Sequence, residues 1–216
     1  MAERMVASWT SAPHFFLVRE VIASALVEMH GRVGPAAERR GGVKPTYTDL
    51  LVKLVAAALR REPRMNASWD GAGIRQHAEV NVGIATAVEE GLLVPVIHAA
   101  DTLTLGEVAA RRRDLVDRAQ SGRLRPEDVA GGTFTISNLG MYNVDAFHAI
   151  VNPPQAGILA VGRLADRVVA IDGQPAVRPT LVLTLSCDHR AIDGARAARF
   201  LDELATLVEE PWGLLA

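Results

Sequence analysis

The spacing of hydrophobic and polar positions divides the 216-residue chain into long helical stripes and shorter strand-like runs. Residues 46–61 predict a helix because their apolar side chains recur on one helical face. These side chains are Leu50, Leu51, Leu54, Val55, Ala58 and Leu59. Thr46 or Thr48 suits the start of this helix, and Pro63 suits its end.

Three further helices are predicted. Residues 104–120 form one, because Thr104-Leu-Gly-Glu107 is a capping box. Residues 22–29 form a short one after the first strand. The last runs from about Gly194 to Glu210 and places its apolar side chains on one face: Ala197, Phe200, Leu201, Leu204, Leu207 and Val208.

Strand-like runs alternate with these helices at irregular intervals. They cover 14–21, 79–88, 92–97, 133–137 and 156–161, and a hairpin joins 167–171 to 176–185 across Asp172-Gly173. Pro95 inside its run indicates an edge strand or a bulge. The irregular order predicts an α/β fold, with a mixed β-sheet flanked by helices and no regular βαβ winding.

The remaining segments are predicted as loops or as mixed polar chain. Residues 31–45 contain Gly31-Arg32, Gly34-Pro35 and a Gly41-Gly42 pair, which are turn signals. Residues 66–74 and 138–144 are also predicted as loops. Residues 1–13 are polar and mixed, with Trp9 as the expected anchor.

Composition narrows the class of protein. Hydrophobic residues make up 49% of the chain and no Pro/Ser/Gly-rich linker divides it, which favours one domain over residues 1–216. A net charge of −2 argues against a broad nucleic-acid footprint. No apolar run approaches the roughly 18 residues that span a bilayer, and the first residues lack a signal-peptide core. The single cysteine, Cys187, fits a reducing, intracellular setting.

The candidate chemistry lies where the last strand passes into the last helix. His189, Asp193 and Gly194 form an H-x-x-x-D-G pattern at this junction. A histidine suits a general base near neutral pH. Asp193 also stands where a helix N-cap belongs, so a structural role explains it about equally well. Ser137, in the loop-like end of an earlier strand, is a weak candidate by itself.

Several alternatives remain open from the residues alone. Cys187 and His189 lie two apart and could form a nucleophile pair, although an ordinary buried cysteine is the more common case. Arg111-Arg112-Arg113 fits a solvated helix face better than a site for an anionic cofactor. The other histidines lack metal-ligand spacing, and no P-loop or G-x-G-x-x-G pattern follows a strand. We therefore expect no bound metal.

Two motifs give the chain a strong resemblance to a known family. Asp188-His-Arg-Ala-Ile-Asp-Gly194 and Gly132-Thr-Phe-Thr-Ile-Ser-Asn-Leu-Gly-Met141 resemble the catalytic core of the dihydrolipoyl acyltransferases of 2-oxo acid dehydrogenase complexes. The resemblance continues at Asn81-Val-Gly-Ile-Ala85 and Asn152-Pro-Pro-Gln-Ala156. The histidine motif is shared with chloramphenicol acetyltransferase and with condensation domains, whereas the serine run is specific to this family.

The resemblance implies a chloramphenicol acetyltransferase-like fold that assembles as a trimer, with active sites between subunits. Coenzyme A and dihydrolipoamide would be substrates, with no tightly bound cofactor. His189 would correspond to the catalytic base, Ser137 to the oxyanion donor and Asp193 to the aspartate or asparagine that follows the histidine. Expected partners are a lipoyl domain and the decarboxylating and dihydrolipoyl dehydrogenase subunits, in the cytoplasm or, in a eukaryote, the mitochondrial matrix.

The acyl group and the assembly are less constrained. Residues 137–142 and 150–155 look most like the acetyl-transferring members that serve pyruvate dehydrogenase. Branched-chain, succinyl or acetoin-derived acyl transfer, a Cys187-based thiol hydrolase and a non-catalytic scaffold are the alternatives. The chain carries neither the lipoyl domain nor the subunit-binding domain of the full-length family. Its Leu214-Leu215 tail resembles the ends that join trimers into 24- or 60-subunit cages.

Overall fold

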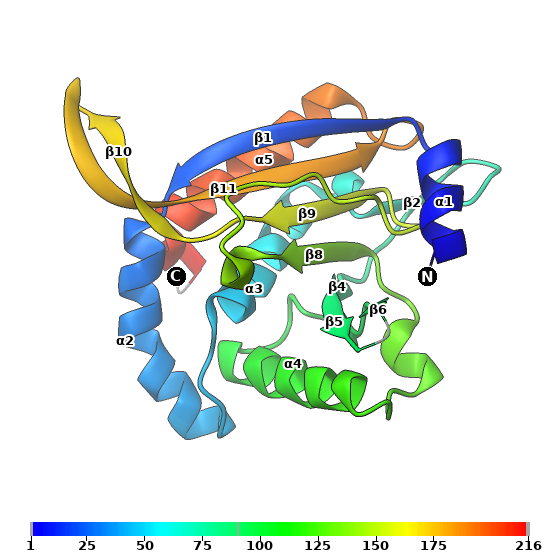
Figure 1. Cartoon of the computed structure of the whole chain (residues 1–216), viewed down its shortest axis with the longest axis horizontal. Coiled ribbons are helices and arrows are strands. Elements are labelled where there is room, and N and C mark those ends of the chain that lie inside the picture. Colours follow the sequence, from blue (N-terminus) through cyan, green and yellow to red (C-terminus); the bar gives the residue numbers. More distant parts are fainter. Residues whose placement is uncertain (1, 90, 215–216) are drawn as a thin grey trace.

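A mixed seven-stranded sheet forms the central layer of the computed structural model, which describes residues 2–89 and 91–214. Helices α3 (Tyr47–Arg61) and α5 (Gly194–Glu209) cover one face of this sheet (Figure 1). The strand order is β1-β11-β9-β8-β4-β7, with β10 paired to β11. β8 runs parallel to β4 and β9, whereas β11 runs antiparallel to all its neighbours. The predicted α/β fold with a mixed, helix-flanked sheet is confirmed.

The main sheet strands lie close to their predicted positions. Their bounds are β1 (His14–Ile22), β8 (Phe134–Asn138), β9 (Gly157–Val161), β10 (Ala165–Ile171) and β11 (Gln174–Asp188). β10 and the first half of β11 form the predicted hairpin. Asp172 and Gly173 at its turn both have positive φ, at 50° and 77°.

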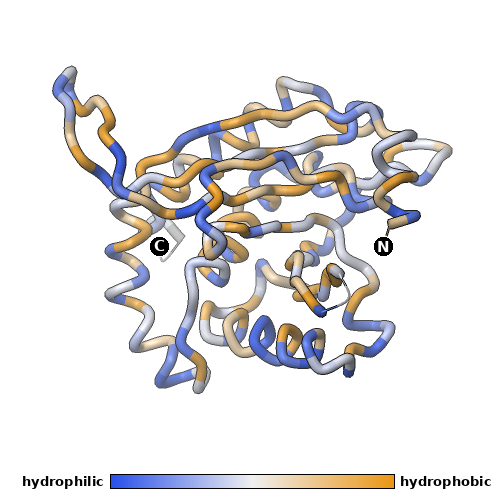
Figure 2. The backbone as a smooth tube through the Cα atoms, viewed as in Figure 1, coloured by the Kyte–Doolittle hydropathy of each residue, from blue (hydrophilic) through white to orange (hydrophobic). Residues whose placement is uncertain are grey.

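Side-chain alternation gives the sheet two different faces. Toward the helices, Leu183, Leu185 and Cys187 of β11 are fully buried, and the ring of Phe134 on β8 meets that of Phe200 on α5 at 5.5 Å between centroids. Figure 2 shows the hydrophobic colour concentrated along these strands. The alternate positions point to the other face, so Ser137 of β8 lies on the face away from the helices.

The two strongest helix predictions are confirmed. Thr46 is the N-cap of α3 and Thr104 that of α4 (Leu105–Gln120), each with a complete capping box. Arg112, in the middle of the predicted arginine run, does not lie on a fully solvated face. Its Nε is 2.7 Å from Oδ1 of the buried Asp49, so this pair joins α4 to α3.

The helix predicted over 22–29 is wrong in length. α2 (Ser24–Gly41) continues through most of the predicted loop and contains Pro35. Gly41, the last residue of the helix, packs closely against α4, and Gly42 after it is the left-handed C-cap. A Cβ on Gly41 would come within 2.8 Å of the carbonyl oxygen of Gly106 on α4. The local sequence pattern predicts the end of a helix at such a glycine, because the helix that packs against it is distant in the sequence.

The prediction for the N-terminus is also wrong. Residues 2–11 form helix α1 (Ala2–Ser11), and Trp9 is 58% exposed instead of acting as a buried anchor. This helix docks through polar groups. The hydroxyl of Ser8 donates to the carbonyl of Val151 at 2.6 Å, and Arg4 donates to the carbonyl of Pro153 at 2.9 Å. Hydrophobic periodicity carries no signal for such contacts.

Two predicted strands are each divided into two shorter strands, and one predicted loop is wrong because it contains a hairpin. The loop predicted at 66–74 holds the hairpin β2 (Ala67–Trp69) and β3 (Ile74–Gln76). The strand predicted at 79–88 is β4 (Val82–Ile84) and β5 (Thr86–Val88), and that at 92–97 is β6 (Gly91–Leu93) and β7 (Val96–Ile97). Pro95 has no N–H for a ladder and separates β6 from the edge strand β7, as its position predicts.

None of the described helices has the length and apolar character needed to cross a membrane.

Candidate active site

His189 lies immediately after β11, at the turn that leads into α5. Its side chain is exposed, and its ring packs on that of Phe15 with 4.7 Å between centroids. Its backbone N–H donates to the carbonyl of Pro13 at 3.0 Å. Within residues 2–89 and 91–214, no group hydrogen-bonds to the imidazole. Both ring nitrogens are therefore available to a substrate or to a second chain.

Asp193 has the structural role that its position suggests. It is the N-cap of α5, and its carboxylate accepts the backbone N–H of Arg196 at 2.9 Å. That hydrogen bond, together with the positive charges of Arg196 and Arg199, lowers the pKa of Asp193 below its ordinary value. The carboxylate is thus ionised at neutral pH and fixes the direction in which the His189 turn enters the helix.

Asp188 and Arg190 complete the turn. No role is predicted for either residue from the sequence. The buried carboxylate of Asp188 accepts the Arg190 backbone N–H at 3.0 Å and its guanidinium at 2.7 Å. The Arg190 guanidinium also lies 5.3 Å from the ring centroid of Trp69. The sequence does show a charged residue on each side of the candidate histidine, and this pattern could have indicated the ion pair. The pair ties the turn to the β2–β3 hairpin.

Ser137 lies near the carboxyl end of β8, on the sheet face away from α3 and α5. The next residue, Asn138, donates to Thr48 Oγ1 at 3.1 Å and accepts the N–H of Gly140 at 2.9 Å. These bonds anchor the start of the loop that carries Met141 and Tyr142, which are 71% and 64% exposed. The end of the strand is thus held by hydrogen bonds, while the exposed loop beyond it is open to a partner or a ligand.

His189 and Ser137 do not meet within one chain. Ser137 pairs with Ala160 of β9, and Ala160 pairs with Thr184 of β11, so Ser137 is level with a residue five positions before His189. Strand rise and strand spacing then separate the two residues by roughly 19 Å. Any site that uses both residues needs a second copy of the chain.

Cys187 is not available as a nucleophile. Its side chain is fully buried between the sheet and the helices. Burial, with a smaller contribution from the charge of Asp188, raises the pKa of the thiol well above its usual range. A thiol that stays protonated and has no access to solvent cannot attack a substrate. The structure therefore argues against a Cys187-based hydrolase.

Two cavities that share lining residues lie at the carboxyl end of β8, on the helix side of the sheet, and the second opens at a basic surface. The first, of about 280 Å³, is lined by Asn138, Gly140 and Met141 together with Thr46 and Tyr47. The second, of about 580 Å³, shares Thr46 and Tyr47.

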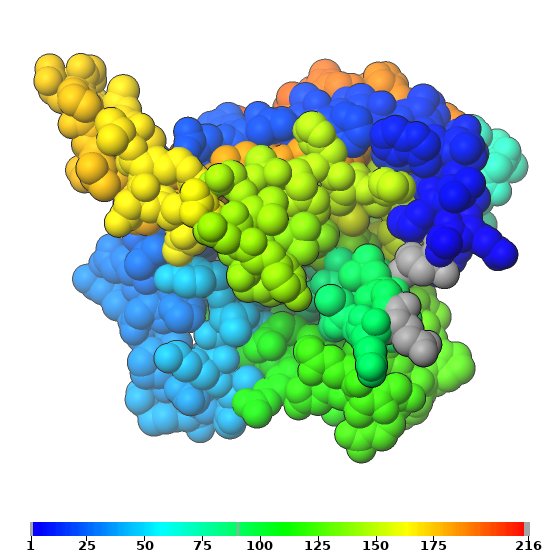
Figure 3. Space-filling view, viewed as in Figure 1, coloured from blue at the N-terminus to red at the C-terminus, as the bar shows by residue number. Residues whose placement is uncertain are grey.

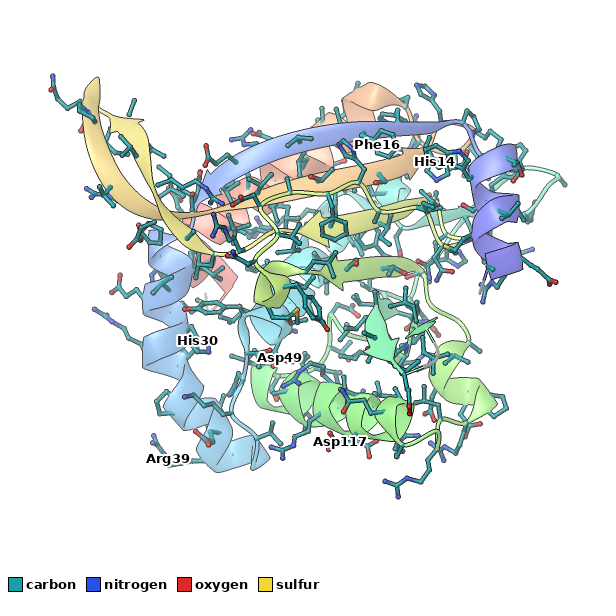
Figure 4. The ribbon with its side chains drawn as sticks, in the orientation of Figure 1. His14, Phe16, His30, Arg39, Asp49 and Asp117 are labelled. Atoms are coloured by element: carbon teal, nitrogen blue, oxygen red, sulfur yellow. The ribbon has the colours of Figure 1, made fainter. Side chains whose placement is uncertain are left out.

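The charged and imidazole side chains that line the second cavity are His30, Lys44, Arg112, Arg113 and the acidic Asp117. Figure 4 shows His30 on α2 near the start of α3. Asp49 neutralises Arg112, and Asp117 is 3.8 Å from Arg113. Lys44 is exposed and adds positive charge. The cavity suits an anionic group. Among the described residues, no cluster of three or more His, Cys, Asp or Glu could hold a metal ion.

Curated relatives resemble the chain over nearly its whole length. The profile of the family described as 2-oxoacid dehydrogenases acyltransferase (catalytic domain) matches residues 1–216. The mitochondrial dihydrolipoyllysine-residue acetyltransferase component of the Schizosaccharomyces pombe pyruvate dehydrogenase complex is 41% identical over 98% of this chain. The alignment covers 44% of that protein. The chain spans about half the length of the curated relatives it matches.

Solved structures match the fold. An Azotobacter vinelandii dihydrolipoamide acetyltransferase aligns with a TM-score of 0.94 and 34% identity, over 100% of this chain and 89% of that one. It was solved in an investigation of the catalytic roles of a serine, a histidine and an asparagine. The cubic core of a pyruvate dehydrogenase complex aligns equally well, at 0.94 and 34% over the same shares.

Chloramphenicol acetyltransferase shares the fold at lower similarity, with a TM-score of 0.58 and 12% identity over 95% of this chain and 94% of that one. The predicted relationship in fold is therefore confirmed. The full-length match to the family profile and the high structural similarity of the cores agree. The chain belongs to the family of 2-oxoacid dehydrogenase acyltransferase catalytic domains.

Proposed function

We propose that the chain transfers an acyl group between the thiols of dihydrolipoamide and coenzyme A, at sites shared by neighbouring copies. The observation that carries this proposal is the placement of His189 and Ser137. Each lies at an accessible end of the sheet, too far apart to act in one chain. With Asp193, they reproduce the chain spacing of the histidine, serine and asparagine studied in the Azotobacter acetyltransferase. The third residue is a carboxylate here and an amide there.

The reaction needs a base and an oxyanion donor. His189 takes the proton from the attacking thiol, because a thiol of ordinary pKa is mostly protonated at pH 7. The new C–S bond places negative charge on the thioester oxygen, and the Ser137 hydroxyl of a neighbouring copy donates a hydrogen bond to it. As the old C–S bond breaks, His189 returns the proton to the leaving sulfur. Asp193 keeps the turn that carries the base in place.

The shared site makes a closed ring of copies the simplest active form, and we propose a homotrimer. The structural likeness to the cubic core of a pyruvate dehydrogenase complex supports this form. Exposed apolar side chains lie on segments next to both half-sites: Val6 and Trp9 on α1, which precedes the 13–15 segment bonded to His189, and Met141 and Tyr142 after Ser137. Whether trimers join into 24- or 60-subunit cages depends on a tail whose last residues, 215 and 216, lie outside the described part of the chain.

The basic cavity gives the coenzyme a place to bind. Coenzyme A is a long thiol with phosphate groups at one end. The cavity beside Asn138 suits the thiol arm, and the cavity at Lys44 and Arg113 suits the phosphates, because Lys and Arg are the usual phosphate partners. The two cavities share Thr46 and Tyr47 as lining residues, so they lie next to each other between the end of β8 and the basic surface.

The double variant Lys44→Ala/Arg113→Ala is expected to raise KM for coenzyme A about tenfold, since each exposed charge pair is worth up to ~1 kcal/mol. The kcat and the KM for dihydrolipoamide should stay within about twofold, because neither residue touches the reacting atoms. Steady-state kinetics with each substrate varied in turn measure this, with Arg64→Ala as the surface control. An unchanged KM for coenzyme A would remove the phosphates from this cavity.

Acetyl is the proposed acyl group, as in the curated relatives. With dihydrolipoamide as acceptor, kcat/KM is expected to be highest for acetyl-CoA and lower for succinyl-CoA, isobutyryl-CoA and other branched donors. A panel of donors at fixed acceptor concentration tests the function and the chain length together. Absence of transfer from every donor, with a folded protein, would refute the proposal. A clear preference for a branched or succinyl donor would retain the reaction and reassign the acyl group.

The proposed partners follow from the reaction. The lipoyl group would arrive on a lipoyl domain, and the decarboxylating and dihydrolipoyl dehydrogenase subunits would load and reoxidise it. The Schizosaccharomyces relative is mitochondrial. We therefore propose that this chain works in the mitochondrial matrix if its source is eukaryotic, and in the cytoplasm otherwise.

A further inference from the structure

His14 joins its own N-terminal segment to a segment that is 137 positions away in the sequence. It begins β1, immediately after helix α1, as Figure 4 shows. Its Nδ1 lies 2.8 Å from the carbonyl oxygen of Ala12, and the backbone N–H of Val151 donates to its Nε2 at 3.1 Å. Because Nε2 accepts a hydrogen bond, the proton must be on Nδ1, which donates to Ala12. The imidazole is thus held in one neutral tautomer.

The segment that His14 holds lies over the sheet face that carries Ser137. Residues 143–156 connect the loop after β8 to β9, and Figure 3 shows this part of the chain spread over that face beside α1. Val151 is buried, and both of its backbone groups are held by side chains from the N-terminus. Its N–H donates to His14, and its carbonyl accepts from Ser8 at 2.6 Å.

The same two segments hold the backbone of the candidate base. His14 pairs with Asp188 across β1 and β11. The Asp188 N–H donates to the carbonyl of Ala156 at 2.9 Å, and the His189 N–H donates to that of Pro13 at 3.0 Å. The backbone of Asp188 is therefore fixed by a bond to the 151–156 segment, and that of His189 by a bond to the 13–15 segment. The His14 side chain joins the 13–15 segment directly to the 151–156 segment, and Ser8 and Arg4 of α1 add bonds to residues 151 and 153.

We infer that His14 is a positioning residue for His189, acting through its bond to Val151. This inference rests on the proposed function and extends it to a residue that touches no reacting atom. The His189 ring packs on the Phe15 ring, so its aim depends on how the 13–15 segment is held. A small shift of that segment moves the base away from the thiol, and such shifts are costly in transfer reactions.

Two substitutions separate the two bonds of His14. His14→Gln places an amide oxygen near the position of Nε2 and keeps an acceptor for Val151, but loses the bond to Ala12. His14→Asn places an amide N–H near Nδ1 and keeps the bond to Ala12, but leaves Val151 without an acceptor. Both remove the ring that packs between Trp9 and Phe16, so loss of aromatic contact is matched between them.

In the assembled protein, His14→Asn is expected to lower kcat about tenfold, the usual scale for one lost hydrogen bond of about 1.5 kcal/mol. KM for both substrates should stay within about twofold, and the oligomer should remain intact. His14→Gln should retain most of the wild-type kcat. Equal losses in the two variants, or no loss in either, would overturn the inference, because then the Val151 bond does not act on the base.

Amide hydrogen exchange tests the same coupling without using activity. In His14→Asn the amides of Val151 and His189 should both exchange faster than in wild type, whereas in His14→Gln both should stay protected. Faster exchange at Val151 with an unchanged His189 amide would refute the coupling. An inactive wild-type chain that shows the expected exchange pattern would refute the proposed function alone.

Discussion

His189→Ala is expected to lower kcat for acyl transfer by about three orders of magnitude, within the range that a positioned general base contributes. The imidazole has no hydrogen-bond partner in the described chain, so its removal breaks no internal bond of the fold. The backbone bond from residue 189 to Pro13 is retained in the variant. The assembled oligomer and its melting temperature should therefore change little. Coupled thiol-release assays and native mass measurement give the two readouts.

The matched control is His98→Ala. His98 is exposed, lies after β7 and has no role in the proposed reaction. It should retain wild-type kinetics. A His189→Ala protein with more than about a tenth of wild-type kcat would mean that another group takes the proton, since a lost general base costs at least about a hundredfold.

Ser137→Ala is expected to lower kcat by about a hundredfold, the cost of one lost oxyanion donor. KM should change little, because the hydrogen bond strengthens only as charge develops on the thioester oxygen. Asn138 keeps its bonds to Thr48 and Gly140 in this variant, so the loop after the strand stays in place. Ser121→Ala, at the exposed end of α4, is the control. A loss below threefold would remove the oxyanion role.

The separation of the two residues gives a sharper test of the shared site. Each site in a ring would take its base from one copy and its oxyanion donor from the next. When His189→Ala and Ser137→Ala chains are co-assembled in equal amounts, about a quarter of the sites regain both groups by random mixing around a closed ring. The mixture of the two inactive variants should then show acyl-transfer activity. Persistent inactivity in verified mixed oligomers would place both groups in one chain, against the register of the sheet.

Sequence patterning succeeded where one element carries its own signal. The stripe and capping box of α3, the capping box of α4 and the Asp172-Gly173 turn each depend on residues a few positions apart, and the structure reproduces all three. It failed where the reason lies in a distant element. α2 continues to Gly41, which packs on Gly106 of α4, and α1 docks by polar bonds to residues 151 and 153.

The candidate site divides in the same way. The H-x-x-x-D-G pattern and the run that contains Ser137 are local, so the sequence by itself was enough to select His189, Asp193 and Ser137 and to indicate the family. Only the tertiary structure decided how they relate. Burial of Cys187 raises the pKa of its thiol and removes it as a nucleophile.

The register from β8 through β9 to β11 sets His189 and Ser137 roughly 19 Å apart. The contact between His14 and Val151 joins residues that are 137 positions apart in the chain. Burial, register and long-range hydrogen bonds arise from packing between elements, and no spacing along a single chain encodes them.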